Sequence, residues 1–175
     1  MAAFLASATV MAGASPLAPD RLRLEYMLEP KGVDVSYPAR FSWSLVHTER
    51  GQAQTAYQVV VRTAGAGGKI FWDSSKMASN VSQNVPIGAT LPADSSYTWT
   101  VQYWDSAGNP SPESAPATFT TGLMADSDWK GAKWVGGGMG QYRKEFPAAK
   151  GEVTRASIYV VGLGYYKLHV NGQKV

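Results

Sequence analysis

The sequence contains no cysteine among its 175 residues. This absence excludes disulfide bonds, thiolate metal sites and cysteine nucleophiles. Histidine is almost as scarce, because His47 and His169 are the only two, and neither has an acidic cluster near it in the sequence. Two isolated histidines do not build a metal site or a catalytic triad. We therefore predict no metal and no cofactor, and we expect both histidines to be solvated or hydrogen-bonded.

Charged residues are also few, at 17% of the chain, and the net charge is only +3. The 16 lysines and arginines are scattered, and Arg143-Lys144 is the only adjacent pair. A nucleic-acid-binding surface would require clustered basic residues, so we predict no nucleic-acid partner. No stretch approaches the ~20 consecutive apolar residues of a membrane span, so we predict none.

We interpret the first 20 residues as a leader, and the apolar run within it ends in the small residues Ala12-Gly13-Ala14. This ending resembles that of a secretory signal, but the usual positively charged start is missing. The leader is therefore either a partial signal peptide or a frayed, alanine-rich segment. Asn80-Val81-Ser82 is a glycosylation sequon, which favours a secreted or extracellular location.

Glycine, proline, tryptophan and tyrosine are abundant, with 18, 10, six and nine residues, as suits short strands joined by tight turns. Residues 91–122 show the pattern best. Tyr97, Trp99, Val101 and Tyr103 alternate with more polar residues, which predicts a strand with one large aromatic face. Turn-forming residues 105–112 follow, and then a second alternating run from Ala117 to Thr121.

Other alternating or apolar runs predict further strands, which are bounded by glycine and proline: Arg21–Glu29, Arg40–Val46, Thr55–Thr63, Lys69–Asp73 and Val81–Leu91. Pro86 in the last of these favours an edge strand or a bend. About seven short strands are typical of an antiparallel sandwich, and we expect Trp43 in its core. The last two strands resemble those of a fibronectin type III module. The spacing from Leu91 to Tyr97 predicts that the tyrosine hydroxyl bonds to the backbone where the chain crosses between sheets.

Residues 123–175 fall into two further segments. Residues 123–140 are polar, aromatic and glycine-rich in turn, and we interpret them as a connection. Strands are predicted again at Gln141–Phe146, Ala156–Val161 and Tyr165–Val170, and Asn171-Gly172 predicts a hairpin turn. Three strands and the beginning of a fourth cannot hide their apolar face alone. We therefore expect residues 141–175 to be the truncated start of a second β domain, and residues 21–122 to be the complete sandwich.

Several patterns that can indicate chemistry have simpler interpretations. Asp126 and Asp128 are two residues apart in the connection, where turn or helix-cap roles are more typical than a glycosidase pair. Residues 136–140 lack the lysine and serine or threonine of a phosphate-binding loop, and residues 162–167 lack a dinucleotide fingerprint. Packing against another domain and stacking on sugars both stay open for four tryptophans: Trp72, Trp104, Trp129 and Trp134.

An ordered set of short motifs runs from residue 38 to residue 172. They are PARFSW (38–43), RGQAQTAY (50–57), WDS (72–74), YTWTV (97–101), TGL (121–123), DWKG (128–131), WVG (134–136), YRKEF (142–146), GLGYYKL (162–168) and NG (171–172). In this order and spacing the chain resembles the bacterial-type α-L-rhamnosidases, which are inverting glycoside hydrolases. The resemblance covers nearly everything after the leader.

The resemblance implies an all-β chain, namely a fibronectin type III-like antiparallel sandwich followed by an incomplete jelly-roll sandwich. In such enzymes the catalytic carboxylates belong to a later helical barrel, so no catalytic residue is carried over to this chain. Some relatives hold rhamnose in the jelly-roll domain with the help of calcium, but the resemblance identifies no carbohydrate-binding residue here. Tyr165 and Tyr166 cannot both face inward, so we expect one of them to contact the catalytic domain.

Two functions follow from these patterns. In the first, the chain is the non-catalytic N-terminal part of an α-L-rhamnosidase-like hydrolase and scaffolds an absent C-terminal catalytic domain. In the second, it is a free-standing carbohydrate-binding or adhesion module. In either case rhamnose-containing glycans are the expected ligands, and the isolated chain is expected to be inactive as an enzyme.

Overall fold

The computed structural model describes residues 15–65, 67–137, 140–147, 150–153 and 155–175. The signal-like ending Ala12-Gly13-Ala14 lies outside these residues, as do Gly138 and Met139 of the glycine-rich run. The chain divides into two units, and the boundary falls between Ala132 and Lys133. No helix in the described parts of the chain has the length and hydrophobicity that crossing a bilayer would require.

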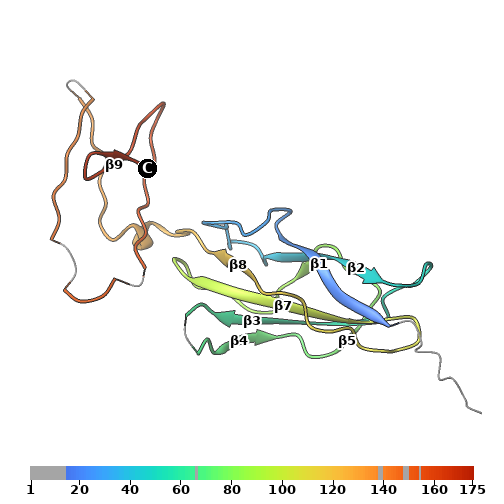
Figure 1. Ribbon diagram of the computed structural model, residues 1–175. Coiled ribbons are helices and arrows are strands. Elements are labelled where there is room, and N and C mark those ends of the chain that lie inside the picture. Colours follow the sequence, from blue (N-terminus) through green and yellow to red (C-terminus); the bar gives the residue numbers. More distant parts are fainter. Residues whose placement is uncertain (1–14, 66, 138–139, 148–149, 154) are drawn as a thin grey trace, which may run out of the picture. The chain divides into compact units, whose positions relative to one another are not determined.

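The first unit consists of two antiparallel sheets, which Figure 1 shows as two layers. One sheet has the order β1-β2-β6, with β1 at Pro16–Leu24, β2 at Arg40–His47 and β6 at Val85–Pro86. The other has the order β4-β3-β7-β8, and β5 also pairs with β3. Its strands are β3 (Ala56–Thr63), β4 (Ile70–Asp73), β5 (Met77–Ala78), β7 (Ser96–Trp104) and β8 (Ala117–Thr120). The all-β sandwich predicted from the sequence is confirmed.

The core lies between the two sheets and follows the predicted alternation. Tyr97, Trp99, Val101 and Tyr103 of β7 are all buried. The ring of Phe41 on β2 lies 4.6 Å from that of Trp99, and the ring of Trp43 lies 5.3 Å from that of Tyr57 on β3. Aromatic rings from facing sheets therefore close the sandwich. Pro86 lies on β6, the edge strand of its sheet, where the lack of an N–H group is tolerated.

Two local predictions for the first unit are wrong. The first strand runs from Pro16 to Leu24 rather than from Arg21 to Glu29, so Tyr26 and Leu28 are exposed instead of facing the core. In the described residues, no hydrogen bond joins the Tyr97 hydroxyl to the backbone at Leu91. Thr121 fastens that crossing instead: its hydroxyl donates to the Pro92 carbonyl at 2.7 Å and accepts from the Ser95 N–H at 2.9 Å.

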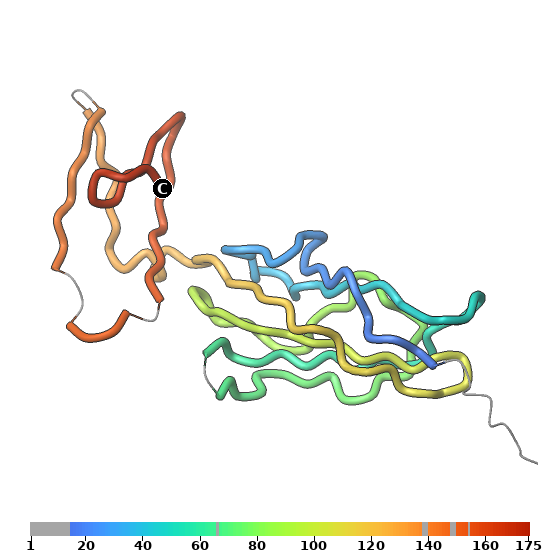
Figure 2. Tube along the Cα trace, in the orientation of Figure 1, coloured from blue at the N-terminus to red at the C-terminus, as the bar shows by residue number. Residues whose placement is uncertain are grey.

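The loop of residues 31–38 is tied to the segment that follows β8, as the path of the chain in Figure 2 shows. The Val33 N–H donates to the Thr120 carbonyl at 2.8 Å, and the Gly122 N–H donates to the Val33 carbonyl at 2.9 Å. A Cβ atom on Gly122 would lie 3.0 Å from the Gly32 carbonyl oxygen, so a side chain would push the two segments apart. The loop is thus held in place by residues about 90 positions later in the chain.

The second unit contains less regular structure than its sequence predicts. A 3₁₀ helix, η1 (Asp126–Trp129), precedes it, and the hairpin of β9 (His169–Val170) and β10 (Gln173–Lys174) lies within it. Asn171 and Gly172 have φ of 50° and 80°, as the predicted turn requires. The described residues of Gln141–Phe146 and Ala156–Val161 are not in strands. A strand requires a paired neighbouring strand, and the pairing described in this unit joins β9 to β10.

Candidate ligand-binding cleft

A tight turn with unusual residues follows β1. Leu24 and Met27 exchange two backbone hydrogen bonds, of 3.0 and 2.9 Å, so Glu25 and Tyr26 are the two central residues of a hairpin turn. Their φ angles are 48° and 65°, in the left-handed region that Asn-Gly and Asp-Gly pairs normally occupy in such turns. Because positive φ is uncommon for glutamate and tyrosine, this turn is held under local strain.

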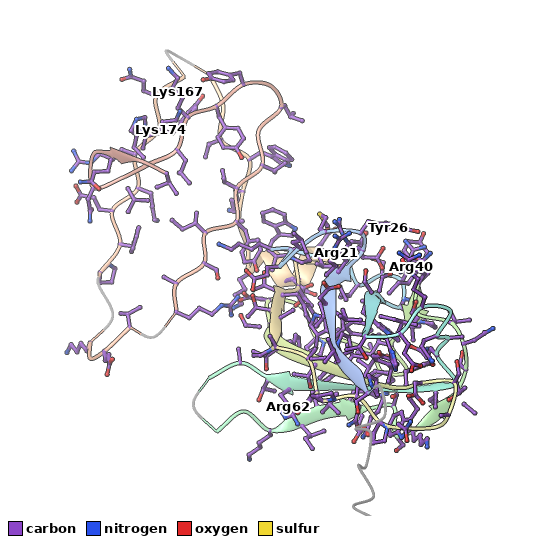
Figure 3. The ribbon with its side chains drawn as sticks, turned by 45° about the vertical axis from the view of Figure 1, so that its right-hand side comes forward. Arg21, Tyr26, Arg40, Arg62, Lys167 and Lys174 are labelled. Carbon is purple, nitrogen blue, oxygen red and sulfur yellow. The ribbon has the colours of Figure 1, made fainter. Side chains whose placement is uncertain are left out.

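Arg40, at the start of β2, fastens the turn. Its backbone N–H donates to Oε1 of Glu25 at 2.8 Å, and its guanidinium donates to both carboxylate oxygens, with Nη2 2.6 Å from Oε2. The guanidinium carbon also lies 5.5 Å from the centre of the Tyr26 ring, and the two side chains are side by side in Figure 3. Side-chain hydrogen bonds from Arg40 outweigh burial and hold the pKa of Glu25 below its usual value.

The turn forms one wall of an open cleft of about 590 Å³, and the loop of residues 31–38 forms another. The size falls within the range of small-molecule sites. The side chain of Tyr37, in the loop, is 77% exposed. The lining residues are Glu25, Met27, Lys31, Gly32, Val33, Asp34, Tyr37, Pro38, Arg40 and Pro86.

The charges that line the cleft cancel. Glu25 and Asp34 carry two negative charges, and Lys31 and Arg40 carry two positive ones. The Asp34 carboxylate accepts a hydrogen bond from the Ser36 N–H at 2.8 Å, and the hydrogen bonds from Ser36 lower the pKa of Asp34. Both carboxylates are therefore ionised at neutral pH. The cleft offers aromatic surface and fixed hydrogen-bonding groups without a net charge.

The two histidines lie elsewhere, and they do not come together. His169 is exposed on β9, whereas the side chain of His47, at the end of β2, is buried beside Asp105. His47 Nδ1 accepts a hydrogen bond from the Glu49 N–H at 3.0 Å, and Nε2 lies 3.5 Å from Oδ2 of Asp105. Within the described residues, no group of three potential metal ligands is present. His47 is thus a hydrogen-bonding histidine.

Asp105 organises the turn after β7. Its carboxylate accepts hydrogen bonds from the Ala107 N–H at 2.9 Å and from the Asn109 N–H and side-chain amide at 2.8 and 3.0 Å. Burial on its own would raise the pKa of Asp105, but these hydrogen bonds and the neighbouring His47 outweigh it and lower the pKa. The nearby Ser106 hydroxyl hydrogen-bonds with the backbone of Ala53, so it is not placed as a nucleophile.

Substitution of Asp105 by Asn is expected to make the first unit less sensitive to acid. The folded-state pKa of Asp105 is below its ordinary value of 3.8, so the carboxylate stabilises the fold above that pH. This stabilisation is lost as the pH falls through the folded-state pKa. In urea unfolding at pH 7 and pH 3, Asp105→Asn should therefore be less stable at pH 7, and the difference should shrink at pH 3. A difference that does not change with pH would contradict this role.

The remaining polar candidates have structural roles. Oδ2 of Asp128 accepts hydrogen bonds from the N–H groups of Met124 and Ala125, both at 2.9 Å, and so caps η1, as the helix-cap interpretation predicted. Asp126 lies in the first turn of the same helix. Gly164 has φ of 123°, a conformation that favours glycine, and a Cβ atom on Gly162 would lie 2.5 Å from the Tyr166 ring.

The aromatic residues divide between packing and exposure. Trp72 packs against the core, parallel to Phe41 at 6.3 Å between ring centres, and the ammonium group of Lys76 lies 4.4 Å from the ring centre of Trp104. Trp129 is half-buried in η1. In the second unit Trp134, Tyr165 and Tyr166 are exposed.

Sequence reasoning missed the cleft. Glu25 and Tyr26 fit the alternation of a strand, and the pair is not a turn-forming dipeptide. The sequence places Arg40 at the start of a strand and within the PARFSW motif, and neither position indicates a ligand-binding role. Nothing local in the sequence links Glu25 to Arg40, 15 residues later. One available signal was Pro30-Lys31-Gly32, which places a break close to the end of the strand.

Comparisons with known proteins agree with this architecture. Residues 19–125 match the model of the family described as "Rha78A-like, N-terminal immunoglobulin domain". An α-L-rhamnosidase of Streptomyces avermitilis is 41% identical over 115 residues, which are 64% of this chain and 11% of that protein. An α-L-rhamnosidase of Formosa agariphila is 29% identical over 191 residues, which are 89% of this chain and 20% of that protein.

A solved structure is similar over the same part of the chain. The Streptomyces avermitilis α-L-rhamnosidase complexed with L-rhamnose has a TM-score of 0.57 and 35% identity, and the match covers 66% of this chain and 11% of that one. The chain thus spans between a tenth and a fifth of the length of these relatives. The resemblance seen in the sequence motifs is confirmed, and the chain belongs to the family of Rha78A-like N-terminal immunoglobulin domains.

Proposed function

We propose that this chain is the non-catalytic N-terminal part of an α-L-rhamnosidase-like glycoside hydrolase, an enzyme that removes terminal α-L-rhamnose from glycosides. One observation carries the proposal: residues 19–125 match an N-terminal domain of such enzymes, and the chain spans only a small part of the length of its relatives. In this role the sandwich scaffolds a catalytic domain, which is its main partner.

The carboxylates of the cleft do not suit glycoside hydrolysis. An inverting glycosidase needs one carboxylic acid that is still protonated at working pH, so its pKa must be raised. The pKa values of Glu25 and Asp34 are both lowered instead, by hydrogen bonds from Arg40 and Ser36 respectively. Both pKa shifts are opposite in direction to the one that a general acid requires, which agrees with a non-catalytic role for this cleft.

The purified 175-residue chain is accordingly expected not to hydrolyse 4-nitrophenyl α-L-rhamnopyranoside. Release of nitrophenolate should stay at the rate of the buffer blank, while a complete α-L-rhamnosidase assayed in parallel gives turnover. Turnover that stays with the chain through successive columns and is lost in Glu25→Gln would overturn the non-catalytic assignment.

The second candidate, a free-standing carbohydrate-binding or adhesion module, is favoured by the cleft, which carries no net charge and is lined by the exposed Tyr37. The coding sequence downstream of Val175 distinguishes the two. An open reading frame that continues into a helical barrel supports the scaffolding role, whereas a stop codon directly after Val175 supports the module.

We also propose that the protein is secreted. The small residues at 12–14 resemble the end of a secretory signal, and β1 begins only at Pro16. Cleavage after Ala14 would thus leave every strand of the sandwich intact. Mass spectrometry of the protein exported by a secreting host should find Ser15 at its N-terminus. An intact leader on protein that is retained in the cell would contradict secretion.

A further inference from the structure

We propose that the cleft between the Glu25–Tyr26 turn and the loop of residues 31–38 binds a neutral pyranose unit of a glycan. The site lies on the immunoglobulin-like unit. Four features of the described residues support it: exposed aromatic surface, a fixed pair of hydrogen-bonding groups, cancelled charge and a strained turn. The choice of rhamnoside as the first probe rests on the proposed function, whereas the cleft itself does not.

The aromatic surface suits the apolar face of a sugar ring. Tyr37 lines the cleft and is 77% exposed, and Met27, which also lines it, is about half exposed. Tyr26, between the lining residues Glu25 and Met27, is 57% exposed. A tyrosine ring contributes a large apolar face together with a polar hydroxyl at one end. The C–H groups on one face of a pyranose can pack on such a ring while the hydroxyl groups remain free to bond.

The Glu25–Arg40 pair suits those hydroxyl groups. Its hydrogen bonds use Nε and Nη2 of Arg40, so they do not involve the two N–H groups of Nη1. The Arg40 side chain is 45% exposed. A planar donor beside a carboxylate acceptor matches two neighbouring sugar hydroxyls, each of which can donate and accept. Because the pair is already joined, ligand binding would not require either side chain to be ordered anew.

The charge of the cleft favours a neutral ligand over an anionic one. The two positive lining residues are matched by two negative ones, and Arg40 is already bound to a carboxylate. A phosphate or uronate would have to displace Glu25 or lie close to it, at a cost in repulsion. A neutral sugar incurs no such electrostatic repulsion.

The strained turn is the fourth observation. Glu25 and Tyr26 have positive φ, although an Asn-Gly pair would adopt this turn without strain. Strain of this kind concentrates at functional sites. Here it positions both the carboxylate that binds Arg40 and the exposed Tyr26 ring, neither of which an Asn-Gly turn could supply.

The test is a titration of the ¹⁵N-labelled 175-residue chain, followed by NMR amide shifts. The probes are methyl α-L-rhamnopyranoside, methyl α-D-mannopyranoside and sodium D-glucuronate. We expect saturable shifts in the millimolar range for at least one neutral glycoside, at the amides of Met27, Val33 and Tyr37, and weaker or absent shifts for glucuronate. Mannoside binding without rhamnoside binding would support the cleft while counting against the proposed parent enzyme.

Variants locate the site. Tyr37→Ser removes the exposed ring that lines the cleft. Tyr26→Asn removes the ring that packs on Arg40, and because Asn tolerates the positive φ, both variants should fold. Each is expected to weaken binding at least tenfold. Tyr165→Ser, which removes a still more exposed ring from the second unit, should leave the affinity unchanged. No saturable shift with any neutral glycoside, stronger binding of glucuronate, or unchanged affinity in Tyr37→Ser would each overturn the proposal.

Discussion

Replacement of Trp43 by alanine is expected to lower the free energy of unfolding by about 3–5 kcal/mol. Trp43 is 1% exposed, packs edge-on against Tyr57 at 5.3 Å between ring centres, and donates from its indole N–H to Oε1 of Gln54 at 3.0 Å. The substitution leaves a cavity between the sheets and also leaves the Gln54 oxygen without its donor. Urea unfolding followed by circular dichroism measures the change.

Trp134→Ala is the matched control, because that side chain is 69% exposed and lies in the second unit. It should change the stability of the sandwich by no more than about 0.5 kcal/mol. For a domain of this size, each kcal/mol corresponds to about 4–8 °C in the melting temperature. A loss of only a degree or two in Trp43→Ala would show that the ring is not part of the core.

The second large effect is expected at Gln54, which is 2% exposed. Its oxygen accepts from Trp43, and its amide nitrogen donates to the carbonyls of Ser79 and Val81 at 3.0 and 2.8 Å. This one side chain therefore joins β2 to the chain that follows β5. Gln54→Ala leaves the buried indole N–H of Trp43 and two partly buried carbonyls without their partner. One buried group left unpaired costs about 1–3 kcal/mol, and we expect a combined loss of about 3 kcal/mol.

Gln54→Glu sharpens the test because it keeps the shape of the side chain. At neutral pH it places a carboxylate oxygen opposite the two carbonyl oxygens that Gln54 now binds. It should therefore lower the free energy of unfolding at least as much as Gln54→Ala does. At pH 4, protonation of the introduced carboxylate should restore part of the lost stability. Gln52→Ala is the control, since the Gln52 side-chain amide reaches only Glu49. Equal stability of the Gln54 and Gln52 variants would refute the role of Gln54.

The features that the sequence predicted are those that depend on a repeated local pattern. The alternation in β2, β3 and β7 identified the residues of both inner faces, including Trp43 and Trp99, because a pleated strand buries every second side chain. Asn171-Gly172 identified its hairpin because few residue pairs adopt positive φ twice. The family motifs pointed to the same architecture.

Features that depend on a single distant contact were not visible. Gln54 is polar and gives no sign of burial, and the Glu25–Arg40 pair that shapes the cleft joins two residues whose types are common on any surface. In the second unit, the alternation at Ile158 and Val160 describes a strand correctly only when a neighbouring strand is present to bond it. Alternation in the sequence indicates which face of a strand is buried, but it does not indicate which strand pairs with it.

The attachment of the 31–38 loop to the segment after β8 has a consequence for the order in which the protein matures during synthesis. The loop emerges from the ribosome early, but its hydrogen-bond partners at Thr120 and Gly122, and the Met124 sulfur that accepts from Val35, emerge about 90 residues later. Domains fold as their chain is completed, and contacts between distant residues form late. A nascent chain therefore forms the cleft only after residue 124 has been synthesised, as the last step in the folding of the sandwich.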